Sequence, residues 1–161
     1  MQKILLLEDD SNLNRGIALL LSREGYEVRQ VYTIKEAKEA FQKGDYALVI
    51  SDITLPDGTG LDFGRMVRAG GDTYLIYLTA LDQEIDIVNG YDTGADDYII
   101  KPFNMDVLRL RIRSLLESRA QLKKLYGKRF SLDEMGIEVV SADERFSQKL
   151  FEVIEKNISD Q

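Results

Sequence analysis

The sequence predicts an α/β protein in which one parallel sheet lies between two layers of helices. Five short apolar runs alternate with segments of helical periodicity, which is typical of parallel strands joined by right-handed helical crossovers. Polar residues directly follow four of these runs, and the carboxyl ends of parallel strands meet at one edge of a sheet. We therefore expect any functional site at that edge.

The strand predictions rest on short apolar runs that are flanked by turn residues. The run that ends at Asp52 is almost entirely apolar, which is typical of a strand buried on both faces, and a turn at Pro56 to Gly58 follows it. The predicted strands are, in chain order, 3–7, 26–31, 47–51, 73–78 and 97–100.

The helix predictions rest on apolar residues at helical spacing between polar caps and glycine stops. The first helix is predicted between a cap at Asp10 or Ser11 and a stop at Gly25, and the second between a cap at Thr33 and a stop at Gly44. Further helices are predicted over 60–68, 83–89 and 143–158, together with a long helix that Asn104 caps.

The composition excludes several kinds of chemistry. The 161 residues include no cysteine and no histidine, which excludes disulfides, thiolates and histidine ligands or bases. No apolar run approaches the ~20 residues of a membrane span, and the first strand begins directly after Gln2, so we expect a cytoplasmic protein without a membrane segment. Residues 1–103 carry 18 acidic and 10 basic side chains, which disfavours a nucleic-acid surface on the globular part.

Carboxylate, hydroxyl and amine groups remain for chemistry, and all three occur at the predicted strand ends. They are Glu8, Asp9 and Asp10 after the first strand, then Asp52, Thr79 and Lys101. Each alone is equally well explained as a helix cap, a turn hydroxyl or a solvated charge. Together they predict a site in which carboxylates hold a hard cation, Mg²⁺ or alternatively Mn²⁺. Lys101 and Thr79 would then hold phosphoryl oxygens, and Asp52 would be the nucleophile that forms an acyl phosphate.

Four motifs resemble, in order and spacing, the receiver domain of bacterial two-component response regulators. They are I-L-L-L-E-D-D, S-D-I-T-L-P-D-G-T-G, L-T-A and G-A-D-D-Y-I-I-K-P-F. The resemblance covers about residues 1–120 and implies a flavodoxin-like, doubly wound (βα)5 sandwich with strand order 2-1-3-4-5. It implies a signalling protein rather than a metabolic enzyme, one that catalyses only its own phosphorylation and dephosphorylation.

The resemblance also implies a role for each acidic residue. Asp52 is the phosphoacceptor, loaded from a phosphohistidine on a sensor histidine kinase. Asp9 is a direct magnesium ligand, and Glu8 acts through water. The backbone carbonyl of Thr54 completes the ligands, and Asp10 is a further candidate ligand of lesser weight.

The remaining site residues match the switch and the lysine of the family. Thr79 and Tyr98 match a switch pair, in which the hydroxyl moves to the phosphoryl group and the aromatic ring turns inward. Lys101 precedes Pro102, and the family has a cis peptide bond there that would aim the ammonium at the site.

A homodimer that forms on phosphorylation is expected through the helix over 83–89, the last strand and the long helix. Asp96, Asp97 and Arg111 match the charged residues of that surface. Ile87 and Val107 stand where the family has a basic and an acidic residue, which favours a more apolar face. Apolar residues at 108, 115 and 122 repeat every seven residues, which is typical of a coiled-coil contact or a linker helix.

We expect three parts: a receiver over 1–120, a linker over 121–142 and an amphipathic helix over 143–161 that begins an output region. The segment S-A-D-E-R-F-S-Q-K-L-F-E-V-I-E-K-N-I-S-D resembles the lead into AraC-type output domains. DNA binding for transcription control is therefore expected only through an output domain absent from this chain.

Three alternatives were weighed. A haloacid-dehalogenase-like Mg²⁺-dependent phosphatase requires Asp-x-Asp, and the run Asp52-Ile53-Thr54 lacks the second acid. The glycines after Asp52 do not have the phosphate-loop spacing of a nucleotide binder. A receiver kept as an unphosphorylated protein-interaction module is disfavoured by the complete acidic set.

Overall fold

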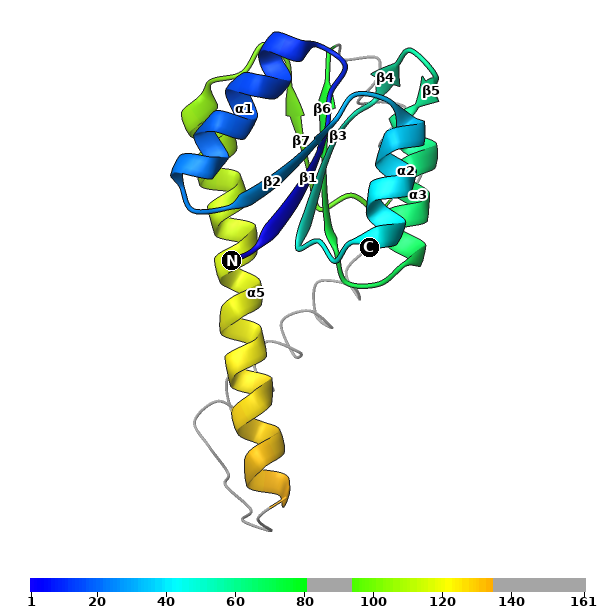
Figure 1. Cartoon of the computed structure of the whole chain (residues 1–161). Coiled ribbons are helices and arrows are strands. Elements are labelled where there is room, and N and C mark those ends of the chain that lie inside the picture. The colour runs from blue at the N-terminus through cyan, green and yellow to red at the C-terminus, as the bar shows by residue number, and fades with distance from the viewer. Residues whose placement is uncertain (81–93, 135–161) are drawn as a thin grey trace, which may run out of the picture. The chain divides into compact units, whose positions relative to one another are not determined.

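The sheet of this computed structural model contains five parallel strands in the order β2-β1-β3-β6-β7 (Figure 1). The structure describes residues 1–80 and 94–134, with side chains up to residue 125. The strands are β1 Lys3–Leu7, β2 Glu27–Val31, β3 Leu48–Asp52, β6 Tyr74–Thr79 and β7 Asp97–Ile100. This order confirms the predicted 2-1-3-4-5 topology of a flavodoxin-like fold.

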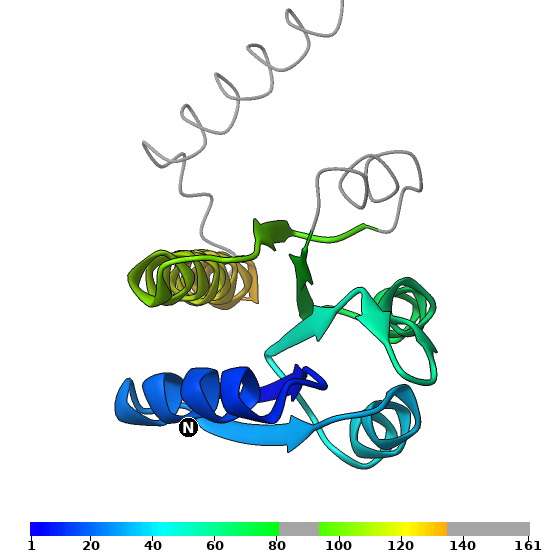
Figure 2. The ribbon, with the colours of Figure 1, turned by 90° about the horizontal axis from the view of Figure 1, so that it is seen from above.

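Helices cover both faces of the sheet, as Figure 2 shows. They are α1 Ser11–Arg23, α2 Ile34–Lys43, α3 Gly60–Ala69 and α5 Met105–Glu134. Alternate strand residues point to opposite faces, so Leu5 and Val49 pack with α2 and α3 in one core cluster. Ile4 and Ile50 pack with α1 and the N-terminal part of α5 in the other.

Polar caps begin the helices as predicted. Asp10, rather than Ser11, caps α1, and its Oδ1 accepts the backbone N–H groups of Asn12 and Leu13 at 3.0 and 3.1 Å. Thr33 caps α2, and Asn104 Oδ1 accepts the N–H of Asp106 in the first turn of α5 at 2.8 Å.

A small antiparallel hairpin follows β3, where only a turn was predicted. Its strands are β4 Thr54–Leu55 and β5 Gly58–Thr59. The N–H of Gly60 then donates to the carbonyl of Ile53 at 2.7 Å, which closes the loop at the start of α3. Strands of two residues have no periodicity that a sequence pattern could reveal.

Helix α5 continues to Glu134, so residues 126–134 are helical, although they were predicted as part of a connector. The chain separates into two units, Met1–Glu117 and Ser118–Gln161, each described by itself. The predicted helices over 83–89 and 143–158, and Ile87, lie outside the described residues, and the division into receiver, linker and C-terminal helix stays a prediction. Within the described ranges, no helix combines the length and the apolar character needed to span a membrane.

Candidate functional site

The sheet register brings four of the predicted site residues to one edge. Glu8 follows the last residue of β1, and Asp52 ends β3 beside Leu78 of β6. Thr79 ends β6, and its carbonyl accepts the N–H of Lys101 at 2.6 Å. Parallel pairing therefore brings Glu8, Asp52, Thr79 and Lys101 to one edge of the sheet, as predicted.

The Lys101 ammonium joins the two buried carboxylates of this edge. Its Nζ lies 2.7 Å from Glu8 Oε2 and 3.0 Å from Asp52 Oδ2. The Glu8 side chain is 1% exposed, the Asp52 side chain 8% and the Lys101 side chain 20%. Water therefore screens these charge-assisted hydrogen bonds little. The peptide bond between Lys101 and Pro102 is cis, as predicted.

Three carboxylates converge at the site. One oxygen from each of Glu8, Asp9 and Asp52 lies within 4.8 Å of the other two. Asp9 is exposed, whereas Glu8 and Asp52 are buried, so solvent reaches the group from the side of Asp9. An oxygen-only set of this kind fits a hard divalent cation such as Mg²⁺.

The environment perturbs the proton affinities of two site residues. Burial raises the pKa of Glu8 to about 6, and the nearby charge of Asp52 adds to the effect, while the Lys101 contact opposes it. Burial would lower the pKa of Lys101, but the hydrogen bonds to Glu8 and Asp52 outweigh it, so this pKa is raised. Lys101 is thus charged at neutral pH.

Asp10 and Thr54 lie next to the site. Asp10 caps α1 and does not belong to the carboxylate group formed by the described residues, so its metal role stays a prediction. The N–H of Thr54 points to Asp52 Oδ1 at 3.4 Å, a long contact that directs the hairpin backbone toward the acceptor. The proposed use of the Thr54 carbonyl as a ligand also stays a prediction.

Thr79 and Tyr98, the predicted switch pair, lie on the neighbouring strands β6 and β7. Thr79 is fully buried at the end of β6. Tyr98 is partly buried, lies opposite Tyr77 in the strand pairing and packs against the core cluster on the side of α2 and α3. Their movement stays a prediction.

The response regulator receiver domain family matches residues 4–113. The chain belongs to this family. Receivers of this family are signalling proteins, phosphorylated by sensor histidine kinases, and bind Mg²⁺ at an acidic pocket.

Relatives and solved structures extend this finding. Response regulator ArlR of Staphylococcus saprophyticus is 38% identical over 86% of this chain, which spans 63% of that relative. Transcriptional regulatory protein BasR of Escherichia coli is 43% identical over 71% of this chain, which spans 52% of BasR. The crystal structure of DrrB, described as an OmpR/PhoB homolog of Thermotoga maritima, is 31% identical with a TM-score of 0.67 and covers 74% of this chain and 54% of DrrB.

These relatives do not support the AraC-type output domain that we expected for this receiver. The solved relative DrrB is described as an OmpR/PhoB homolog. The expectation rested on residues 141–160, which lie outside the described part of the chain.

The charged residues expected at a dimer surface are engaged within the receiver itself. Asp96 Oδ2 lies 2.9 Å from Arg68 of α3 and accepts the N–H of Leu75 at 2.8 Å. Arg111 Nη1 lies 2.7 Å from Asp97 Oδ1. Dimerisation on phosphorylation stays a prediction.

The sequence reasoning missed two residues that shape the receiver site. Asn14 of α1 is fully buried, and its Nδ2 donates to the backbone carbonyls of Glu8 and Val31 at 2.9 and 3.1 Å. A Cβ on Gly60 would lie 1.9 Å from the carbonyl oxygen of Asp52, so only glycine fits there. The signal for Asn14 is a polar residue on the apolar face of α1, and the signal for Gly60 is its place at the end of the motif S-D-I-T-L-P-D-G-T-G.

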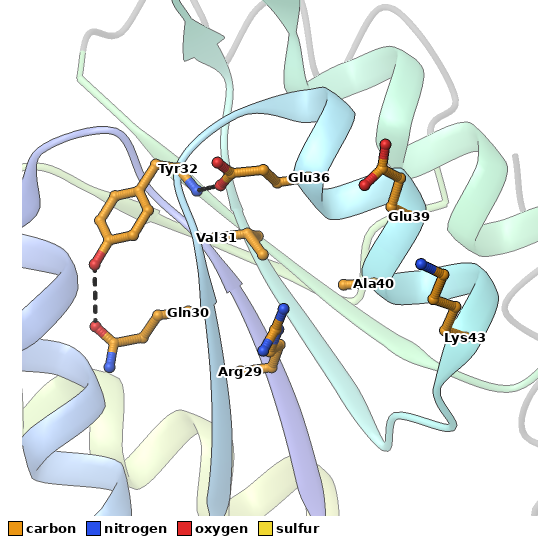
Figure 3. Close-up of a pocket in the computed structure, with 8 residues that line it drawn as sticks. All are labelled: Arg29, Gln30, Val31, Tyr32, Glu36, Glu39, Ala40 and Lys43. Carbon is orange, nitrogen blue, oxygen red and sulfur yellow. Dashed lines mark hydrogen bonds between the residues drawn. The ribbon is translucent and has the colours of Figure 1, made fainter.

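A hollow of about 340 Å³ lies away from this site, on β2 and α2 (Figure 3). Glu36 reaches back to accept the N–H of Tyr32 at 2.8 Å, and the Tyr32 hydroxyl faces Gln30. Two basic and two acidic side chains line the hollow, so its charge favours no one class of ligand. The lining residues are Arg29, Gln30, Val31, Tyr32, Glu36, Glu39, Ala40 and Lys43.

Proposed function

We propose that Asp52 accepts a phosphoryl group from a sensor histidine kinase in a Mg²⁺-dependent reaction. The observation that carries this proposal is the Lys101 ammonium, which is hydrogen-bonded to both Glu8 and Asp52 beside the exposed carboxylate of Asp9. A nucleophilic carboxylate, a cation-binding group and a fixed positive charge are the parts that phosphoryl transfer needs.

In the proposed transfer, a carboxylate oxygen of Asp52 attacks phosphorus while the bond to the donor nitrogen breaks. Lys101 holds one phosphoryl oxygen, and the hydroxyl of Thr79 donates to another. The cation, Mg²⁺ or alternatively Mn²⁺, would be held by Glu8, Asp9, Asp52 and the Thr54 carbonyl. When bound, it would neutralise the negative charge on the transferred group. Hydrolysis of the acyl phosphate at the same site would reset the receiver.

The proposed output is a two-state change that begins at Thr79. When its hydroxyl bonds the phosphoryl group, Tyr98 turns inward and the surface of β7 and α5 changes. We propose that this surface controls transcription through an output domain of the OmpR/PhoB type in the cytoplasm. The description of DrrB as an OmpR/PhoB homolog supports that type of output, and a phosphorylation-induced homodimer is its expected form.

Intact-mass measurement after incubation with Mg²⁺ and acetyl phosphate tests the acceptor. We expect one added phosphoryl group that hydroxylamine removes, and no addition with EDTA or in Asp52→Asn. An adduct that persists in Asp52→Asn would show that another residue is the nucleophile. A wild-type chain that gains no phosphoryl group from either acetyl phosphate or a phosphorylated kinase would refute the proposal.

A further inference from the structure

Asn14 is a polar residue on the buried face of α1. It is 0% exposed and shares this face with Ile17, Ala18 and Leu21, which are all buried. The spacing of these positions is that of one helix face packed on the sheet. An apolar residue at position 14 would complete this face.

The Asn14 amide joins two strand ends. Its Nδ2 donates to the carbonyl of Glu8 at 2.9 Å and to the carbonyl of Val31 at 3.1 Å. The N–H of Glu8 also donates to the Val31 carbonyl, at 3.2 Å. The Glu8 carbonyl belongs to the planar peptide bond that connects Glu8 to Asp9, so Asn14 fixes the orientation of that peptide plane.

The hydrogen-bonding capacity of the Asn14 side chain is only partly satisfied. Its Oδ1 is buried and has no hydrogen-bond partner, which costs folding free energy. A buried acceptor left without a partner calls for a role beyond packing.

We propose that Asn14 is a positioning residue that orients the acidic pair Glu8-Asp9 for cation binding. The inference rests on the proposed function. The Glu8 carboxylate has partners of its own, since it accepts the N–H of Asp10 at 3.1 Å and the ammonium of Lys101. Among the described residues, the Asp9 side chain makes no hydrogen bond or ion pair, so the position of its backbone is the main constraint that brings its carboxylate to the site. Loss of the Asn14 amide therefore acts mainly on Asp9.

The substitution Asn14→Leu tests this role, because leucine keeps the size of the side chain and fits the apolar face. We expect about a tenfold rise in the Mg²⁺ concentration that half-saturates acyl phosphate formation, the scale seen when supporting partners of metal ligands are lost. At saturating Mg²⁺ the rate returns to within about twofold of wild type, because Asp52, Lys101 and Thr79 are untouched. Initial rates with acetyl phosphate, followed by intact mass over a Mg²⁺ titration, give both quantities.

Two matched variants separate positioning from stability. Asn12→Leu makes the same change at an exposed position of α1, and Leu21→Val loosens the same buried face. Both should keep the wild-type Mg²⁺ dependence, and Asn14→Ser, which keeps one donor, should fall between Asn14→Leu and wild type. The proposal is overturned if Asn14→Leu keeps the wild-type half-saturation, or if Leu21→Val shifts it equally.

Calorimetric titration of Mg²⁺ into the unphosphorylated chain keeps this test independent of phosphoryl transfer. A weaker Mg²⁺ affinity in Asn14→Leu supports the positioning role even where no acyl phosphate forms. Equal affinities in the two proteins refute it, whatever the outcome for Asp52.

Discussion

The ammonium of Lys101 stabilises two carboxylates that would otherwise repel each other. It lies within 3.0 Å of both Glu8 and Asp52, and the two acids are nearly excluded from water. Two neighbouring buried carboxylates without a cation raise each other's pKa and favour protonation. The lysine thus offsets the repulsion between the Glu8 and Asp52 carboxylates.

Replacing Lys101 with methionine should slow acyl phosphate formation by about a hundredfold, since it removes a preorganised positive charge from the transferred group. It should also lower the free energy of unfolding at neutral pH by about 1–3 kcal/mol, because two buried charges lose a partner. Intact-mass time courses and urea denaturation measure the two effects. Lys38→Met, at an exposed position of α2, should change neither, and equal rates for both variants would contradict the role of Lys101.

Gly60 fits its place because it has no side chain. A Cβ there would lie 1.9 Å from the Asp52 carbonyl oxygen, whereas a Cβ on Gly16 of α1 would meet its nearest neighbour, Met105 Cε, at 3.7 Å. Gly60→Ala should lower the free energy of unfolding by about 2–3 kcal/mol through overpacking against backbone. Gly16→Ala should raise it by about 0.5–1 kcal/mol through helix propensity. Urea denaturation followed by circular dichroism compares them, and a neutral Gly60→Ala would show that the loop has room to shift.

The N-terminus of α2 is held by groups from two different segments. Thr33 Oγ1 accepts the N–H of Glu36 at 3.2 Å. Asp57, in the turn of the β4–β5 hairpin, accepts the N–H groups of Ile34 and Lys35 at 2.9 and 3.1 Å. A carboxylate at this end also interacts favourably with the helix dipole. Asp57 therefore ties the loop that follows the acceptor to a neighbouring helix.

The stability that Asp57 supplies should depend on pH. The hydrogen bond from Ile34, with that from Lys35, lowers the pKa of Asp57 from its usual 3.8. A lowered folded-state pKa means that the contribution is complete above pH 3.8 and is lost as pH falls through the lower value. Asp57→Ala should therefore be less stable than wild type at pH 7, and the difference should shrink in stronger acid. Urea midpoints at several pH values, with exposed Asp72→Ala as control, measure it, and a pH-independent difference would contradict the assignment.

The receiver concentrates its polar chemistry at one end of an apolar sheet. Two core clusters fill the spaces between the sheet and its helices, and the buried polar residues Glu8, Asp52 and Thr79 all lie at the carboxyl edge. A ligand that binds this edge of the folded chain, and does not bind the unfolded chain, must stabilise the whole fold.

Mg²⁺ should accordingly raise the free energy of unfolding. At a free concentration ten times its Kd, the gain is about 1.4 kcal/mol, and EDTA should abolish it. Asp9→Asn removes a carboxylate from the group without burying a new charge, so it should lose most of the gain. Thermal or urea denaturation at several Mg²⁺ concentrations gives the result, and equal shifts in both proteins would place the ion elsewhere.

The sequence predicted the strands and the strand-end site because apolar runs and the polar residues after them are local signals, whereas the strand order followed from the resemblance to the receiver family. The buried run before Asp52 and the Asp10 and Thr33 caps are examples. Parallel pairing then makes distant residues such as Glu8 and Lys101 neighbours without further information.

Local sequence patterns did not predict the contacts that side chains make with distant segments of the chain. The ion pair between Arg68 and Asp96, and the Asp57 contact with α2, join residues that no local pattern connects. Glycine and serine in residues 126–134 favoured a connector, yet without proline nothing there prevents a helix.

The loop after the acceptor has no spare length. Residues 53–59 are fixed at both ends by the Ile53–Gly60 hydrogen bond and in the middle by Asp57. A peptide tag or fluorescent reporter inserted between Pro56 and Asp57 would therefore strain the backbone on both sides of Thr54. The exposed turn at Gly71 and Asp72, which a long 3.5 Å contact from Arg68 Nη1 to the Thr73 carbonyl spans, is the better place to attach one.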